Sequence, residues 1–553
     1  MTNKRLSLIT KLALVFLLSV NVLFTSAQNT NYFETSKNIE IFTDLYKELD
    51  LFYVDEVNSG DLIKTAIDQM LKSLDPYTTY IPESDIEDYR FMTTGQYGGI
   101  GSMITKRGEY VFISEPYEGF PAQKAGLMAG DKIVEVNGKS AKGKSTEELS
   151  SVLKGQPNTE VTVLLERDGE LLTKTFKREK VTVKSVPYYG FLKDGIAYIK
   201  LRSFTRNCAN DIKDALTDLK SQQELKGIVL DLRSNPGGLL NESIDIVNLF
   251  VEKGEEIVVT KGKIKDWEKS YKARKSPEDL ETPLIVLINS NSASASEIVS
   301  GSIQDLDRGV IIGRRSYGKG LVQQTRKLSY NSQLKVTVAK YYIPSGRCIQ
   351  ALDYSNRNED GSVGTVPDSL ISTFYTRNGR EVKDGGGVMP DIKMKNEEIA
   401  DVTISIIRKR LIFDFATEFR YKNEEIVAAE DFEITDEIFD DFISFLSDKE
   451  YEYTTSTEEA LDIFKEITDE EGTSELIEEE FTLLLEKIKS NKKNDLQNSK
   501  KELKEFLANE IVSRYYYQEG RIIERLQHDK DIEEALRLLD NLEEYQSILM
   551  ENE

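Results

Sequence analysis

Three short segments hold side chains whose type and spacing suit the cleavage of an acyl bond. The first segment, Asn289-Ser-Asn-Ser-Ala-Ser-Ala-Ser-Glu297, follows an apolar stretch and precedes a predicted helix. Its small residues let a ligand approach the backbone, and the N–H groups at the start of a helix stabilise a developing oxyanion. A serine here is therefore a candidate nucleophile. Serines also cap helices, so each of them has a purely structural interpretation as well.

A lysine that can serve as the base lies in the second segment, Ser316-Tyr-Gly-Lys-Gly-Leu-Val-Gln-Gln324. Lys319 lies between two glycines and has no acidic neighbour in the sequence. A lysine acts as a general base when desolvation favours its neutral form. Gln323, four residues later, can orient the amine. The alternative is a solvated lysine in a glycine turn.

The third segment, Asp231-Leu-Arg-Ser-Asn-Pro-Gly-Gly-Leu239, ends a predicted strand in a Pro-Gly-Gly turn. Backbone N–H groups near Gly237 or Gly238, together with that of Ala295, are candidate donors to an oxyanion. The alternative is an ordinary turn between a strand and a helix.

The histidine and cysteine counts narrow the chemistry. His528 is the single histidine, and it lies in a charged helical stretch near the end of the chain. This excludes a histidine-based zinc site, and a Ser-His-Asp triad would depend on that one distant residue. We predict neither a metal nor a cofactor. Cys208 and Cys348 lie 140 residues apart without Cys-x-x-Cys spacing, which favours two free buried thiols over a disulfide.

The elements that must position these segments lie in residues 182–393, where apolar strands alternate with helices. Strands of this kind predict a mostly parallel sheet that is covered on both faces. Ligands gather at the carboxyl ends of such strands, which is where all three segments fall. The predicted strands are Gly195–Leu201, Gly227–Arg233, Pro283–Ile288 and Val310–Gly313; the predicted helices are Ala209–Lys220 and two that begin near Asn241 and Ala293.

Residues 94–181 change to short strands separated by glycine turns. Their order includes a short helix from Pro121, an Asn-Gly turn, a helix over Thr146–Lys154 and an Asp-Gly hairpin. This order resembles a PDZ domain, and Ala122–Gly138 fits that family closely.

The glycine loop of this PDZ-like region predicts a peptide-binding site. Backbone N–H groups in such a loop can turn inward as a nest that holds a carboxylate. The strand that follows can offer its edge to an extended peptide. The predicted loop residues are Tyr97, Gly98, Gly99, Ile100 and Gly101.

The three segments, in this order after a PDZ-like region, resemble the C-terminal processing (tail-specific) peptidases. The motifs D-x-R-x-N-P-G-G, S-A-S-A-S-E and G-K-G-x-V-Q carry the resemblance, and Tyr341–Gln350 and Asp384–Asp391 match later family segments. The resemblance covers about residues 35–393. It implies a serine endopeptidase that cleaves the C-terminal part of exported proteins through an acyl-enzyme.

The resemblance also implies roles for single residues. Ser294 is the expected nucleophile, Lys319 the base and Gln323 the residue that orients it. Expected substrates are protein or peptide chains with a free C-terminus, which the PDZ region would recognise to control cleavage. Arg167 is expected to report a bound ligand to the core, with a solvated hairpin residue as the alternative. The alternative function is a catalytically inactive PDZ-containing peptide-binding or scaffold protein.

The net charge of −24 is concentrated at the end of the chain. Residues 401–553 carry −23 and residues 1–400 carry −1. Nucleic acid is therefore not an expected partner, since phosphate binding needs a basic surface. We expect the acidic helical region to pack on the core or to mediate self-association or adaptor binding. Its apolar stripes at helical spacing are Leu503, Phe506, Leu507, Ile511 and Ile532, Ala535, Leu536, Leu539.

The N-terminus carries the features of an export signal: Lys4, Arg5 and Lys11, an apolar run over Leu12–Phe24 and a small-residue cleavage site at Thr25–Ala27. An uncleaved anchor is the alternative. We predict an exported protein, in the periplasm or associated with a membrane.

Two further apolar stripes, over residues 39–52 and 62–74, predict N-terminal helices with core faces. The expected fold is thus multidomain α/β, with a layered α/β peptidase core, a PDZ-like β-rich domain and helical N- and C-terminal regions. The predicted segments are a signal peptide (1–27), helical region (28–93), PDZ-like domain (94–181), core (182–393) and acidic helical region (394–553).

Overall fold

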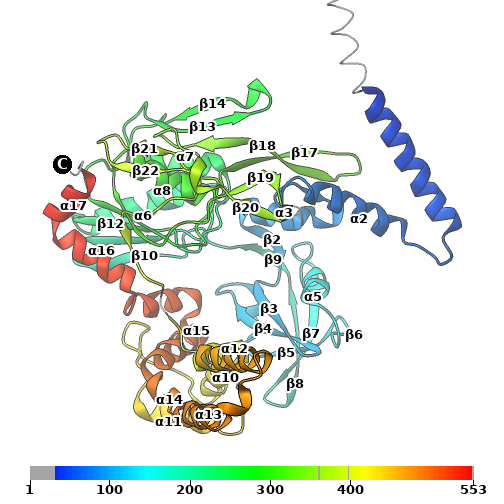
Figure 1. Ribbon diagram of the computed structural model, residues 1–553, viewed down its shortest axis with the longest axis vertical. Helices are drawn as coiled ribbons and strands as arrows, with labels where there is room; N and C mark the ends of the chain where they lie inside the picture. The colour runs from blue at the N-terminus through cyan, green and yellow to red at the C-terminus, as the bar shows by residue number, and fades with distance from the viewer. Residues whose placement is uncertain (1–31, 359–361, 397, 493, 551–553) are drawn as a thin grey trace, which may run out of the picture. The chain divides into compact units, whose positions relative to one another are not determined.

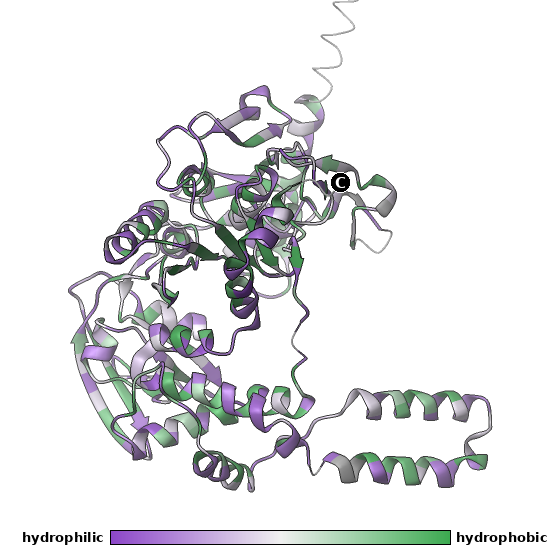
Figure 2. Cartoon of the chain, turned by 90° about the vertical axis from the view of Figure 1, so that its left-hand side faces the viewer, coloured by the Kyte–Doolittle hydropathy of each residue, from purple (hydrophilic) through white to green (hydrophobic). Residues whose placement is uncertain are grey.

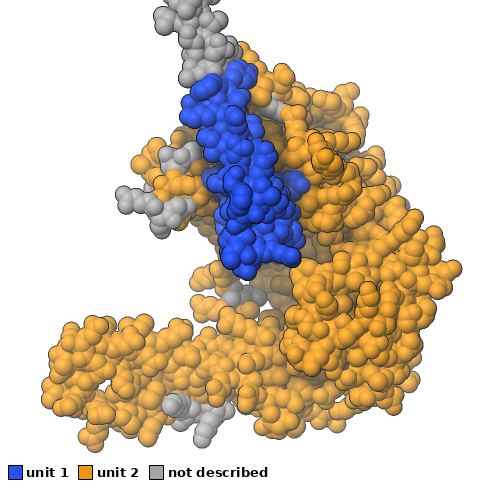
Figure 3. Space-filling view, turned by 90° about the vertical axis from the view of Figure 1, so that its right-hand side faces the viewer, with its two compact units in different colours: residues 1–80 blue, residues 81–553 orange. Residues whose placement is uncertain are grey.

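The computed structural model describes residues 32–358, 362–396, 398–492 and 494–550. The chain divides into two compact units, residues 1–80 and residues 81–553 (Figure 3). The predicted signal peptide, residues 1–27, lies outside the described residues. Within the described ranges, no helix is both long enough and apolar enough to cross a membrane.

The described part of the first unit is mainly two helices, residues 32–52 and α2 (Ser59–Lys72). The side chain of Asn58 accepts hydrogen bonds from the N–H groups of Gly60 and Asp61 at the start of α2, which explains where that helix begins. The prediction that the first apolar stripe is core is wrong for this unit, because Ile39, Phe42, Leu45, Leu49 and Phe52 are exposed. Helical spacing places these residues on one face but supplies nothing to cover it.

The PDZ-like region is a small β-rich fold with its own hydrophobic core. Five strands pair in the order β3–β4–β5–β7–β8, so β3 forms one edge of the sheet. The predicted Asn-Gly and Asp-Gly turns are confirmed, since Asn137, Gly138, Asp168 and Gly169 all have positive φ. After α3 (Ile86–Thr94), the elements are β2 (Gln96–Gly99), β3 (Ser102–Arg107), β4 (Tyr110–Pro116), α4 (Pro121–Lys124), β5 (Lys132–Val136), β6 (Lys139–Ser140), α5 (Thr146–Leu153), β7 (Glu160–Arg167), β8 (Glu170–Lys177) and β9 (Glu179–Thr182).

The second unit also contains a six-stranded sheet, in the order β10–β11–β12–β15–β16–β23. Its strands from β11 to β23 are parallel, and β10 is antiparallel to β11. Every residue of β12, β15 and β16 is buried, and Figure 2 shows the central strands in the green of hydrophobic residues. The prediction of a mostly parallel buried sheet is confirmed. The strands are β10 (Tyr188–Lys193), β11 (Ile196–Lys200), β12 (Gly227–Asp231), β15 (Leu284–Ile288), β16 (Val310–Gly313) and β23 (Ile392–Lys393).

One face of this sheet is covered by the helices that connect its strands. From β11 to β16 the spatial order follows the chain, so right-handed crossovers place every connecting helix on the same face. These helices are α6 (Cys208–Gln222), α7 (Leu240–Asn248) and α8 (Ala295–Asp305). Their buried side chains share one core with β11, β12 and β15.

The opposite face of the sheet is covered by the end of the chain. α16 (Lys530–Asp540) and α17 (Leu542–Leu549), drawn in red in Figure 1, pack their apolar side chains on it. Ile532, Ala535 and Leu538 lie in one core with Val229 and Ile285 of the central strands. By packing, these two helices belong with the core sheet, and the expectation that the acidic region packs on the core is confirmed for them.

An antiparallel sheet that sequence analysis did not predict lies in the same unit. β13 (Glu256–Gly262) pairs with β14 (Lys269–Lys272) and with β18 (Gln333–Tyr342), which also pairs with β17 (Leu321–Lys327). The β17–β18 hairpin begins just after Lys319. Two smaller hairpins follow, made of β19 (Leu352–Arg357) and β20 (Val363–Thr365), and of β21 (Thr373–Tyr375) and β22 (Glu381–Lys383).

The remaining helices are α9 (Asp401–Arg408), α10 (Leu411–Lys422), α11 (Asp436–Leu446), α12 (Ser456–Glu470), α13 (Glu478–Lys492), α14 (Asp495–Asn498) and α15 (Lys500–Leu526), which is kinked at Tyr517. Helices α9, α10, α11, α14 and α15 contribute to a separate aromatic-rich core, in which the predicted stripe is confirmed, since Leu503, Leu507 and Ile511 are fully buried. Cys208 and Cys348 are both free, and Cys348 is only partly buried.

Candidate active site

Ser294 differs from the two other serines of its motif. It precedes α8 with φ 56° and ψ −108°, a backbone conformation that costs about 1–3 kcal/mol and that clusters at functional sites. Its side chain is partly exposed, whereas Ser292 and Ser296 are fully buried. The hydroxyls of those two serines donate to the carbonyl oxygens of Leu232 (2.8 Å) and Asn235 (2.9 Å). Ser292 and Ser296 are thus structural.

A buried carboxylate, Glu297, joins the serine segment to the lysine segment. Its Oε2 accepts hydrogen bonds from the N–H groups of Ser294 (2.7 Å) and Lys319 (2.9 Å). Its Oε1 accepts from the Ser316 hydroxyl and the Gly318 N–H, both at 2.6 Å. Burial raises the pKa of Glu297 to about 7, while these four hydrogen bonds favour the ionised form.

The phenol of Tyr341, which is 1% exposed, makes a second connection between the same two residues. Its hydroxyl lies 2.7 Å from the carbonyl oxygen of Lys319 and 3.1 Å from that of Ser294. Glu297 and Tyr341 therefore hold Ser294 and Lys319 through both N–H and C=O. Sequence analysis missed both roles, although Glu297 ends the serine motif and Tyr341 begins a later family segment.

The Pro-Gly-Gly turn lies against the proposed nucleophile. A Cβ added to Gly237 (φ 95°) would come within 3.0 Å of both the Ser294 Cβ and the Ala295 nitrogen, so this close approach requires glycine. The Gly237 N–H donates to the side chain of Asn235 (2.9 Å). Ala295 is the first residue of α8, where the helix itself offers no acceptor for the N–H. Gly238 forms a bridge with Phe204 next to this turn.

Hydrogen bonds from the serine segment fix the backbone of the loop 232–238. The Asn289 side chain accepts from the Ser234 N–H (2.8 Å) and donates to the Ser234 hydroxyl (3.1 Å). The Ala293 N–H donates to the carbonyl of Asn235 (3.0 Å), which also accepts from Ser296. The segments after β12 and β15 thus form one rigid edge, as their place at neighbouring strand ends predicts.

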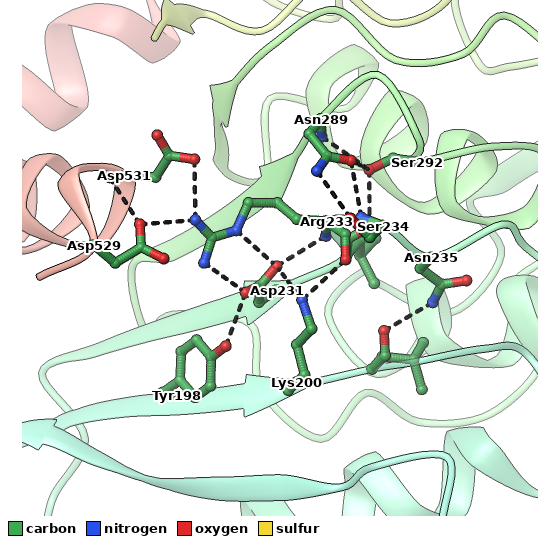
Figure 4. Close-up of polar contacts among 12 residues, drawn as sticks. Tyr198, Lys200, Asp231, Arg233, Ser234, Asn235, Asn289, Ser292, Asp529 and Asp531 are labelled. Atoms are coloured by element: carbon green, nitrogen blue, oxygen red, sulfur yellow. Dashed lines mark hydrogen bonds and ion pairs between the residues drawn. The ribbon is translucent and has the colours of Figure 1, made fainter. Parts of the chain in front are cut away.

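Beneath this edge lies a buried group of charges around Asp231 (Figure 4). Both carboxylate oxygens of Asp231 accept from the Arg233 guanidinium, at 3.1 and 2.7 Å, and one of them lies 3.0 Å from Lys200 Nζ. The Tyr198 hydroxyl donates to the same carboxylate at 2.8 Å. Burial alone would raise the pKa of Asp231, but the charges of Arg233 and Lys200 hold it well below its usual range.

The other predicted site residues lie farther along the chain. Gln323 lies in β17, and its amide donates to the Thr337 hydroxyl (3.2 Å) across the hairpin. Arg167 forms a two-point ion pair with the buried Asp131, at 2.6 and 2.7 Å, and donates to the Gly126 carbonyl. These contacts lie within the PDZ-like region, so a link from Arg167 to the core stays a prediction.

The structure narrows the predicted glycine nest. Gly98 and Gly99 lie in β2 and pair with β9, and only Gly101 of the three glycines has a positive φ, of 71°. The N–H groups of Gly101 and Ser102 face the hydroxyl of Tyr97 and partly oppose the burial that raises its pKa. An oxygen acceptor therefore already lies at this turn. Ile100 is buried in the PDZ core.

Comparison with known proteins places the chain among peptidases. Models of peptidase family S41, of a PDZ domain and of the C-terminal helical domain of probable PDZ-proteases match residues 195–368, 112–167 and 402–539. The carboxy-terminal-processing protease of Bartonella bacilliformis is 38% identical over 358 residues, which are 64% of this chain and 79% of that protein. The chain belongs to the carboxy-terminal-processing proteases of peptidase family S41.

Two further proteins are similar to this chain. A probable CtpA-like serine protease of Staphylococcus aureus is 37% identical over 61% of this chain and 65% of its own length. The solved photosystem II D1 C-terminal processing protease is 29% identical over 64% of this chain and 92% of its own, with a TM-score of 0.36. As a carboxy-terminal-processing protease, the chain is a serine-type, PDZ-containing enzyme. The family match also includes the acidic helical region, which the motif resemblance had left out.

Proposed function

We propose that this protease is an endopeptidase whose nucleophile is Ser294 and whose general base is Lys319. One observation carries the proposal: Glu297 and Tyr341 each contact the backbones of both residues. Ser294 and Lys319 are also both partly buried.

In the proposed reaction, the Ser294 Oγ attacks the carbonyl carbon of the peptide and its proton passes to the neutral amine of Lys319. The carbonyl oxygen takes up the electron pair and accepts hydrogen bonds from the N–H groups of Gly238 and Ala295, because the Gly237 N–H is held by Asn235. Cleavage of the C–N bond then sends the proton from Lys319 to the leaving amine. Water hydrolyses the resulting ester by the same steps and restores Ser294.

The test is turnover of fluorescein-labelled casein, an unfolded substrate, by the purified full chain. Ser294→Ala should lower kcat by about 10⁴-fold or more, as loss of a nucleophile does. Ser302→Ala, in which a buried hydroxyl of the same helix is lost, should retain turnover. Activity in Ser294→Ala together with its loss in Ser292→Ala or Ser296→Ala would show that the nucleophile is misassigned. No cleavage by the unmodified chain would favour the inactive scaffold.

We also propose that the PDZ region recognises the free C-terminus of the substrate. The edge of β3 supports this, since an extended peptide can pair with it. The carboxylate of that peptide would replace the Tyr97 hydroxyl at the N–H groups of Gly101 and Ser102. Converting the substrate carboxylate to an amide removes the charge, so cleavage of the amide form should fall about tenfold. Equal cleavage of both forms would contradict PDZ control.

Contacts of α15 offer one route from the PDZ region to the core. Arg521 pairs with Glu115 of β4 (3.3 Å), and Gln518 accepts from Arg202, which follows β11 (3.2 Å). A ligand that favours one arrangement of these contacts would shift the equilibrium of the core. We further propose that substrates are exported proteins and that the enzyme lies in the periplasm or at a membrane, which cell fractionation with N-terminal sequencing would test.

A further inference from the structure

The first turn of α16 brings two carboxylates from the end of the chain to the loops of the proposed active site. Asp529 caps this helix, and its Oδ1 also accepts from the Arg233 guanidinium (2.8 Å). Asp531 Oδ2 accepts from Arg233 (3.0 Å) and from Arg314 (2.5 Å). Figure 4 shows both aspartates on one side of Arg233, opposite Asp231. Their side chains are 8% and 3% exposed, so solvent screens these charges little.

The two arginines lead directly to the proposed catalytic groups. Arg233 is followed by the loop that reaches Gly238, one of the proposed oxyanion donors. Arg314 follows β16 and lies five residues before Lys319. Asp531 thus contacts an arginine at the start of each loop, whereas Asp529 contacts only the first.

The charges in this group balance. Three carboxylates face three cations: Asp231, Asp529 and Asp531 against Lys200, Arg233 and Arg314. Removing Asp531 takes away the carboxylate that pairs with Arg314 and one of the three that pair with Arg233, and removing Asp529 takes away another of those three. The excess buried positive charge then favours movement of the arginine, or of the loop that bears it, toward water. Loss of either aspartate is therefore expected to displace the loop and not only to weaken one contact.

Neither attachment nor capping of α16 requires these ion pairs. The helix is already held by the apolar side chains of Ile532, Ala535 and Leu538 on the sheet. An asparagine caps a helix as well as an aspartate does, so the charge of Asp529 is not needed for that purpose. What the two charges add is a fixed position for Arg233 and Arg314.

We propose that Asp529 and Asp531 are positioning residues of the peptidase reaction. They fix Arg233 and Arg314, and through them the loops that bear the oxyanion donors and Lys319. This inference rests on the proposed function of Ser294 and Lys319. Residues of the acidic helical region thereby complete a site whose reacting groups all lie before residue 320.

The experiment measures kcat and KM for labelled casein with the full chain and its Asp529→Asn and Asp531→Asn variants. Both changes keep size and, at residue 529, the helix cap. Asp531→Asn should lower kcat about 10- to 100-fold with KM changed less than about twofold, since displacement of catalytic groups by about 1 Å costs that much. Asp529→Asn, which frees only one arginine, should have the smaller effect.

A matched control is Asp279→Asn. Asp279 is also a buried carboxylate, 5% exposed, paired with Lys220 and Arg308, but it precedes β15 and so lies at the amino end of the parallel strands. Its variant should lose thermal stability comparably and keep kcat. If Asp531→Asn lowers the Tm as Asp279→Asn does but leaves kcat unchanged, the role of Asp531 is structural and the proposal is wrong.

A double-mutant cycle separates positioning from general weakening. If Asp531 acts through the arginines, Asp531→Asn should cost little further kcat in an Arg233→Gln/Arg314→Gln background. An undiminished effect there would overturn the proposal. If Ser294→Ala retains activity, it is the proposed nucleophile that fails, so the two failures are distinguishable. Circular dichroism at the assay temperature shows which variants are folded, and the single Asp529→Asn variant serves should the others unfold.

Discussion

The loop 232–238 is held from two sides by contacts of different kinds. On one side, Asn289, Ser292 and Ser296 make neutral hydrogen bonds with its backbone. On the other side, Asp529 and Asp531 form ion pairs with one of its side chains. The first set comes from the next strand of the sheet, and the second comes from about 300 residues farther along the chain.

The difference shows why one set is visible in the sequence and the other is not. Backbone contacts at close range need small residues, so the first set leaves a run of serines and alanines that stands out. A carboxylate that neutralises a buried arginine can come from any helix that ends nearby. In the acidic region, Asp529 and Asp531 look like two more of its many solvated charges.

The largest effect is expected from the proposed base, Lys319, which lies outside the loop that both sets of contacts hold. Lys319→Arg should lower kcat by about 10⁴-fold, as much as Lys319→Ala, because arginine keeps its positive charge and cannot be deprotonated to act as the base. Steady-state turnover of casein at pH 8 measures it. Near-normal turnover of Lys319→Arg would mean that the residue supplies only positive charge, and the proposed dyad would fall.

Chain order alone predicts part of the fold. Apolar strands that alternate with helices gave the parallel sheet, and the strand order from β11 to β16 explains why α6, α7 and α8 share one face. The same rule assigns no helix to the opposite face of the sheet. That face is covered by α16 and α17 from the end of the chain, and no local sequence pattern predicts this packing. The stripe of α16 is buried while the similar stripe of residues 32–52 is exposed, because burial depends on a partner and periodicity does not encode one.

The second effect concerns the attachment that brings Asp529 and Asp531 to the loop. Leu538 is fully buried between α16 and the sheet, so Leu538→Ala should lower the free energy of unfolding by about 2–5 kcal/mol. Leu542→Ala, on the neighbouring helix and 49% exposed, should change it by less than about 0.5 kcal/mol. Urea unfolding monitored by fluorescence measures both. Equal effects would show that α16 is not a structural part of the core.

The third effect is a pH dependence that belongs to Glu297. Its pKa in the folded chain is about 7, against an ordinary value of 4.5. Between these values the folded state binds more protons than the unfolded state, so stability falls as the pH rises from 4.5 to 7. Turnover should rise over the upper part of the same range, because only the ionised carboxylate can accept all four hydrogen bonds, of which two come from the N–H groups of Ser294 and Lys319.

Glu297→Gln tests both halves of this expectation. The amide NH₂ cannot accept a hydrogen bond, so the variant should lose about tenfold in kcat and the rise in turnover near pH 7. The free energy of unfolding of the variant, measured with urea, should also depend less on pH between pH 4.5 and pH 7. A rise near pH 7 that persists in Glu297→Gln would assign the titration to another group, with Lys319 the first to examine.

The site itself was only partly predictable for related reasons. The motif order indicated Ser294 and Lys319, because nucleophile and base need special neighbours. Tyr341 was missed because its strand, β18, belongs to the antiparallel sheet that the mixed polar sequence did not reveal. The predicted nest included too many residues, because a run of glycines does not show which of them adopts a positive φ. Of Gly98, Gly99 and Gly101, only Gly101 does so in the structure.

The smallest effect is expected one residue away from the positioning pair. His528 is exposed and directly precedes Asp529. It is the single histidine of the chain, so a histidine mechanism would have to use it. His528→Ala should change kcat by less than about twofold, as exposed substitutions away from buried networks do, while Asp529→Asn in the same turn lowers it. Comparing the two variants at one pH separates the effect of the ion pair from that of the surrounding turn. A loss of kcat in His528→Ala as large as that in Asp529→Asn would show that the loop is positioned by the turn and not by the carboxylate.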